Sequence, residues 1–133
     1  MQLKLEKDTE FLEETIFNDP MSEPIIYNLT IKIENSIAKT WLNKMEQSYL
    51  PDCIGEDPIS SQINELMLES EDDDASFAVQ LTFASPEMFE NKGVEIVNKL
   101  IVLMDNDFRN RYVYFGTKMR LLHLVRNSHT DFE

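Results

Sequence analysis

Regular alternation of apolar and more polar residues is the feature that most constrains the fold of this 133-residue chain. The clearest run covers residues 25–33, where Ile25, Tyr27, Leu29, Ile31 and Ile33 stand at every second position. Two further runs follow the same period, one with Phe77, Val79, Leu81 and Phe83, the other with Val113, Phe115, Met119 and Leu121. A weaker candidate lies between Ile59 and Leu68. Alternation of this kind predicts half-buried strands.

Two stretches with helical spacing separate these runs. In the first, Ile37, Trp41, Leu42, Met45 and Tyr49 form one apolar stripe. Asn35 and Ser36 are good N-caps for this helix. The sequence Leu50-Pro51-Asp52 is expected to end it, because proline lacks the backbone donor that the next turn needs.

The second helix is expected to begin at Ser85-Pro86-Glu87, a hydroxyl cap followed by proline and an acid. Gly93 is expected to divide a short first piece from the main helix. The predicted buried face consists of Val94, Val97, Leu100, Ile101, Met104 and Phe108. A last strand over residues 113–125 follows, with a bulge or bend expected at Gly116.

The order strand, helix, strand, strand, helix, strand predicts an α+β fold of the split β-α-β type, βαββαβ. It implies a four-stranded antiparallel sheet with two helices on one face, over residues 24–125. Residues 1–23 form an acidic N-terminal extension, with seven acidic residues against two lysines and a net charge of −5. Residues 69–74 are read as a solvated acidic hairpin turn, and residues 126–133 as a polar tail.

Three interpretations of the extension stay open. In the first, it is a mobile or loosely docked arm. In the second, it forms a short amphipathic helix over residues 8–17, which packs Phe11 and Ile16 onto its own domain or onto a partner subunit. In the third, the natural start lies at Met21.

Composition excludes several classes of function. The net charge of −13 disfavours nucleic acid and anionic lipid surfaces as partners. Cys53 is the only cysteine, so the chain has no intrachain disulfide, no CxxC pair and no thiolate zinc cluster. Cys53 follows a helix end, whose negative dipole would raise the thiol pKa, and is read as unreactive. No metal-ligand spacing and no phosphate-binding glycine motif occurs, so no cofactor is expected.

Localisation is inferred by elimination. The first residues contain no apolar core of a secretory signal, and no apolar stretch approaches the ~20 residues of a membrane span. The sequence therefore predicts a cytoplasmic protein.

Three short segments resemble a known family. Ile26-Tyr27-Asn28 in the first strand, Trp41-Leu42 in the first helix and Leu50-Pro51 after it are similar to a small bacterial domain of unknown function, associated with Bacteroidetes. The resemblance covers residues 25–125. It implies a ferredoxin-like fold of the dimeric α/β-barrel type and a homodimer, and it carries no known activity or catalytic residue.

A physical argument also favours a homodimer. Two helices cover only one face of a four-stranded sheet, so the other face needs a second layer or a polar surface. The exposed face is expected to carry Ile26, Asn28, Thr30 and Lys32, then Ala78, Gln80 and Thr82, then Tyr112, Tyr114, Lys118, Arg120, Leu122 and Leu124. This mixed surface suits an isologous, semi-polar interface.

Two functional classes are weighed. The leading prediction is a homodimeric binding or interaction module without catalysis, holding a small anionic or aromatic ligand near Asn28, Tyr114 and Arg120. The alternative is a small cofactor-independent oxidoreductase of the monooxygenase kind, with Tyr27, Trp41 and His123 around an internal pocket. A filled core around Trp41 would favour the module.

Basic residues gather near the C-terminal end of the chain. Arg109, Arg111, Lys118, Arg120 and Arg126 are not interrupted by any acid. The leading interpretation is that these basic residues form ion pairs with the protein's own acids. Binding of a small anionic ligand ranks second, and binding of nucleic acid ranks third.

Overall fold

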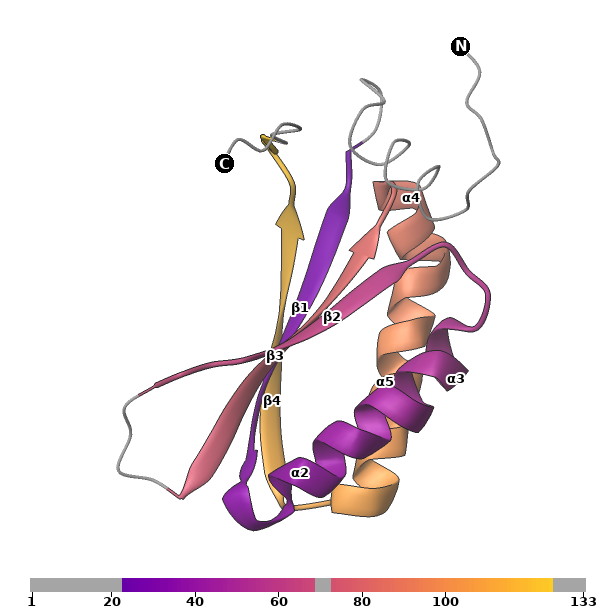
Figure 1. Ribbon diagram of the computed structural model, residues 1–133. Coiled ribbons are helices and arrows are strands. Elements are labelled where there is room, and N and C mark those ends of the chain that lie inside the picture. The colour runs from indigo at the N-terminus through magenta and orange to yellow at the C-terminus, as the bar shows by residue number, and fades with distance from the viewer. Residues whose placement is uncertain (1–22, 69–72, 126–133) are drawn as a thin grey trace, which may run out of the picture.

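The computed structural model describes residues 23–68 and 73–125. The elements follow the predicted order (Figure 1): β1 (Ile25–Glu34), α2 (Asn35–Lys44), the π-helical turn η1 (Met45–Tyr49), α3 (Leu50–Ile54), β2 (Ser60–Glu65), β3 (Asp74–Phe83), α4 (Pro86–Met88), the π-helical turn η2 (Phe89–Gly93), α5 (Val94–Phe108) and β4 (Tyr112–Arg120).

The four strands form one antiparallel sheet in the order β2-β3-β1-β4. Figure 1 shows that the helices from α2 to α3 and from α4 to α5 pack on the same side of the sheet. This is the ferredoxin-like arrangement, and it confirms the predicted fold class. The opposite side, here called the open face, carries no described helix or strand.

The core lies between the sheet and the helices. On the central strands the predicted alternation is confirmed: Leu29, Ile31, Val79, Leu81 and Phe83 are fully buried toward the helices. Trp41, Met45, Leu100 and Met104 meet them from the helical layer. Fully burying each such side chain contributes about 1.5–3 kcal/mol, so this layer is the main source of stability.

The first helical segment differs from the prediction at both ends. Neither Asn35 nor Ser36 caps it, since Glu34 occupies the N-cap position, and its side chain accepts no hydrogen bond from the amides of the first helical turn. Pro51 does not end it either. In the π-helical turn η1 the amide of Leu50 bonds the carbonyl of Met45, and the chain then passes Pro51 at the start of α3. The segment ends at Gly55, whose positive φ of 62° suits glycine.

The start of the second helical segment confirms the prediction. The Ser85 side chain accepts a hydrogen bond from the Met88 amide at 3.1 Å, and Pro86 is the first helical residue. Gly93 ends the π-helical turn η2, where an added Cβ would lie 2.4 Å from the Phe89 ring. One residue of the predicted buried face is wrong, because Val94 is 49% exposed; Ile96 is buried instead.

The last strand differs from the prediction in length and in orientation. It ends at Arg120, and every residue from Tyr112 to Arg120 pairs one-to-one with β1, so Gly116 forms no bulge. The register places Tyr112, Tyr114, Gly116, Lys118 and Arg120 opposite the helix-facing residues of β1. Val113, Phe115, Thr117 and Met119 therefore lie on the open face, and the predicted orientation of this strand was wrong.

Contacts with the helices explain this orientation. The Tyr112 hydroxyl donates to Asp105 of α5 at 2.6 Å, and the Lys118 ammonium lies 5.0 Å from the centre of the Phe89 ring. The Tyr27 ring occupies the space above Gly116, where a Cβ would lie 2.0 Å from its hydroxyl. Gly116 thus serves close packing rather than a bend.

Some predictions lie outside the described residues. These are the interpretations of residues 1–22, most of the acidic turn and the polar tail after residue 125. Among the described residues, no helix has the length and apolarity required to span a membrane.

Candidate functional site: the open face of the sheet

The open face is built from the outward residues of all four strands, arranged in rows across the sheet. The register places Ser60, Thr82, Ile26 and Met119 in one row and Gln62, Gln80, Asn28 and Thr117 in the next. A third row consists of Asn64, Ala78, Thr30 and Phe115. The face therefore has a polar centre and an apolar border along β4.

The apolar border consists of Val113, Phe115 and Met119, with Ile26 beside them on β1, and is called here the β4 stripe. Val113 is 65% exposed and Phe115 is 62% exposed. Large apolar side chains that adjoin one another on a surface mark interaction sites more often than isolated ones do. Their burial by a second layer would be favourable.

The polar centre is a row of amide side chains. The Gln62 amide donates to the Gln80 carbonyl at 3.3 Å, and the Asn28 amide donates to the Thr30 hydroxyl at 2.9 Å. The Asn28 Oδ1 atom is buried and has no hydrogen-bond partner within the described part of the chain. A buried acceptor without a partner costs about 1–3 kcal/mol, and neither water nor a donor from outside reaches the Oδ1 atom where it lies.

The structure does not bring together the residues of the predicted small-ligand site. Asn28 lies on the open face as expected. Tyr114 and Arg120 lie on the helix side of β4, opposite Ile31 and Ile25, so their predicted place on the open face was wrong. Tyr114 stacks on Tyr112 with ring centres 6.2 Å apart.

Nor are the three residues of the oxidoreductase alternative gathered around a pocket. Trp41 has no exposed surface and packs against Phe77 at 4.8 Å, so the space between helix and sheet is filled there. Tyr27 stacks on Phe89 at 5.6 Å. His123 was expected to point toward the helices, but it is exposed and follows the end of β4, so the alternation of the strand does not orient it.

One member of the basic group pairs with the protein's own acid, as predicted. Arg111 donates two hydrogen bonds to Glu34 Oε1, at 3.0 Å from Nε and 2.8 Å from Nη2.

No cluster of three or more metal-ligating side chains occurs among the described residues. Burial is the main cause that raises the pKa of the Cys53 thiol, and the nearby Asp52 carboxylate raises it further. This agrees with the prediction that the thiol is unreactive.

Sequence reasoning placed Val113 and Phe115 in the core, and so missed them as surface residues. Lys118 and Arg120 share one face of β4 with Gly116 and two tyrosines, whereas the other face holds Val113, Phe115 and Met119. By hydropathy the second face belongs inside. On an edge strand this rule weakens, because the helices cover only part of its inner side.

The comparisons with known proteins bear on the fold and the family. The structure is similar to the de novo designed protein Foldit4, with a TM-score of 0.51 and 7% identity over 77% of this chain and all of that one. At such identity the likeness concerns the fold alone. No curated protein matches this chain. The model of a family described as "Domain of unknown function (DUF4286)" matches residues 24–122. The chain therefore belongs to this domain-of-unknown-function family, DUF4286.

Proposed function

We propose that this protein is a homodimeric interaction module whose two subunits meet through the open faces of their sheets. The observation that carries the proposal is the β4 stripe, with Phe115 62% exposed on a face that no described element covers. The filled core around Trp41 supports a module rather than an enzyme with an internal pocket.

The size of the open face is compatible with this role. Strands about 4.8 Å apart and up to 10 residues long give a flat area on the order of 600 Å² before side chains are counted. A standard interface buries about 800 Å² on each partner. The face must therefore be used almost entirely, including its polar centre.

The polar centre suits contact between two copies. In an isologous interface each side chain meets the partner's copy of the same surface. Asn28 and Gln80 are neighbours in the central row and carry both donors and acceptors. The amide groups of this row can therefore pair with those of the other subunit, whereas the buried Asn28 Oδ1 atom lies out of reach of a partner.

Native mass spectrometry tests the proposal on the full chain and on a version that starts at Met21. We expect a dimer at micromolar concentration for both. Phe115→Lys should convert it to monomer, because removing an interface anchor costs about 2 kcal/mol or more. Val102→Lys is the matched control, since Val102 is 56% exposed on α5. Monomers of the unaltered protein, or a dimer unchanged by Phe115→Lys, would contradict the proposal.

The binding of a small anionic or aromatic ligand stays a prediction. The same spectra address it, because a ligand that copurifies with the protein adds its own mass to the dimer. No specific observation favours the oxidoreductase over the module.

A further inference from the structure

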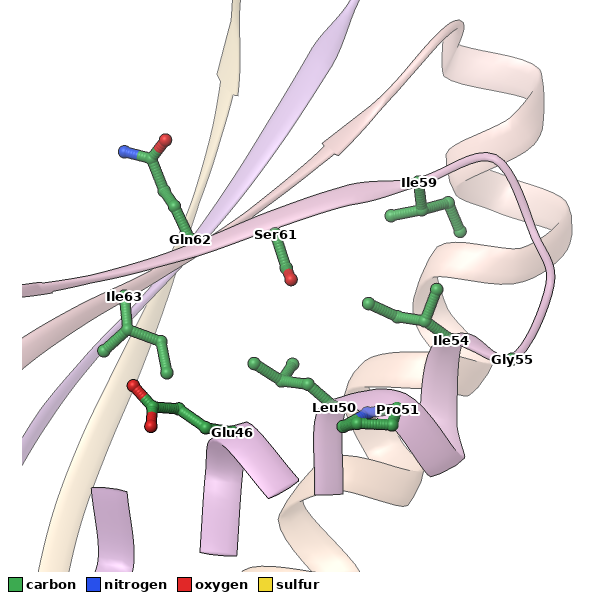
Figure 2. A pocket seen from close by; sticks show the side chains of 9 residues that line it. All are labelled: Glu46, Leu50, Pro51, Ile54, Gly55, Ile59, Ser61, Gln62 and Ile63. Atoms are coloured by element: carbon green, nitrogen blue, oxygen red, sulfur yellow. The ribbon is translucent and has the colours of Figure 1, made fainter. Parts of the chain in front are cut away.

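A groove lies beside β2 on the helix side of the sheet. Figure 2 shows Ile59, Ser61 and Ile63 of β2 and its preceding loop facing Leu50 and Ile54 of α3. Its volume is about 440 Å³, within the range of about 300–1,000 Å³ typical of binding clefts. The groove runs along the strand rather than into the core.

The lining of the groove combines an apolar floor with one acid. Leu50 and Ile59 are buried, and Ile54 and Ile63 are half-buried. The exposed Glu46 of η1 lies at the Ile63 end, as Figure 2 shows. This arrangement fits two apolar side chains followed by a cation.

The strand that borders the groove has a free edge. Within residues 23–68 and 73–125, β2 is outermost in the sheet and pairs only with β3. Natural edge strands are shielded by lysine, proline, bulges or covering elements. β2 has no lysine, proline or bulge, and its single charged residue, Glu65, stands at its last position. Main-chain hydrogen bonding to an added strand is therefore open to it.

The N-terminal extension contains a segment that matches the groove. Residues 2–7 read Gln-Leu-Lys-Leu-Glu-Lys, so Leu3, Leu5 and Lys7 share one face of an extended chain. Lys4 and Lys7 are the only basic residues in 1–23. We propose that residues 2–7 dock along the free edge of β2, with Leu3 and Leu5 over the groove floor and Lys7 beside Glu46.

The connection to the domain is long enough for docking within one chain. Ile26 of β1 and Ser60 of β2 both pair with Thr82, so both strands begin at the same end of the sheet. Their separation is two strand spacings, about 10 Å. If residues 8–17 are helical, they span about 15 Å. Residues 18–23 add about 20 Å when extended. Together they are longer than the separation of the two strands.

The other free edge of the sheet suits this segment less well. On its helix side β4 carries Lys118 and Arg120, which would repel Lys7. The Glu46 carboxylate at the β2 groove attracts it instead. The charge pattern thus selects β2 as the docking edge.

Hydrogen exchange of the full chain, followed by mass spectrometry of the peptides that contain residues 60–65, tests the proposal. We expect Leu5→Asp to speed exchange there by about tenfold, since the free-edge amides lose their partners. Leu12→Asp, an equal change outside the segment, should leave it unaltered. Equal exchange in all three proteins would overturn the docking.

A charge exchange tests the pairing of Lys7 with Glu46. Lys7→Glu and Glu46→Lys should each speed exchange of β2, and the double variant should restore the slow rate. No restoration would overturn this register. Protection that grows with protein concentration would assign the groove to the segment of a second copy and overturn docking within one chain.

Discussion

At the scale of single residues, Gly116 determines how closely β4 approaches the helical layer. A Cβ at this position would lie 2.0 Å from the Tyr27 hydroxyl, so Gly116→Ala must displace the ring that stacks on Phe89. We expect a loss of about 1–3 kcal/mol in the free energy of unfolding, as for other overpacked sites. Urea unfolding measures it. Tyr27→Leu should relieve the clash, so a double variant whose loss equals the sum of the single losses would contradict this account.

Also at the scale of single residues, Asp107 makes a contribution to the free energy of unfolding that depends on pH. It accepts a hydrogen bond from Tyr49 and lies 3.5 Å from the Lys44 ammonium, and the Tyr49 bond, chiefly, holds the pKa of the Asp107 carboxyl below its ordinary value. A lowered folded-state pKa stabilises the protein above the ordinary carboxyl pKa of about 3.9, and this contribution disappears as the pH falls through the folded value.

The variant Asp107→Asn tests this contribution. It should lower the free energy of unfolding at pH ~7 and differ less from the original at a pH below the folded-state pKa, where the carboxyl group is protonated in both states. Glu90→Gln, an exposed site that also loses one negative charge, is the control. An equal loss at both pH values would show that the effect is not the titration of Asp107.

At the scale of elements, the two helical segments begin in different ways. Ser85→Ala should cost about 1 kcal/mol, because the Met88 amide loses its acceptor. Ser36→Ala should change the unfolding free energy by less than about 0.5 kcal/mol, because no side chain caps the first segment. Chemical denaturation of both variants checks the difference. A larger loss for Ser36→Ala would mean that the Ser36 side chain caps the first helix.

Both helical segments also contain a π-helical turn, and each adapts the helix to its surroundings. In η1 the wider turn lets the chain continue through Pro51. In η2 the small Gly93 leaves room for the Phe89 ring, which contacts Tyr27 and Phe83. Neither turn follows from apolar spacing, because the stripes keep the helical period on either side.

At the scale of the whole molecule, the proposed dimer links stability to concentration. A dimer that unfolds to monomers gains stability by mass action as the protein concentration rises. We expect the midpoint of thermal unfolding to increase with concentration for the unaltered protein and to be constant for Phe115→Lys. Scanning calorimetry at several concentrations measures it. A midpoint that is independent of concentration in both proteins would contradict association through the β4 stripe.

The candidate site was only partly predictable. The alternation in β1 and β3 placed Asn28 and Gln80 on the open face, because central strands bury one whole side. The assignment of Tyr114 and Arg120 to the same face was wrong. His123 is exposed beyond the end of β4, so the alternation of the strand could not orient it. These residues belong to an edge strand and to the chain beyond it, where hydropathy no longer indicates which side is covered.

Local periodicity and local hydrogen bonding were enough to predict the element order, the ferredoxin-like topology, the inward residues of the two central strands and the cap at Ser85. Tertiary contacts were needed to show which side of β4 faces the helices, how the first helix passes through Pro51 and what fills the space above Gly116. These depend on strand register and on side chains distant in sequence, such as Tyr27 and Asp105. The same long-range packing leaves Phe115 exposed, and on that exposure the proposed interface depends.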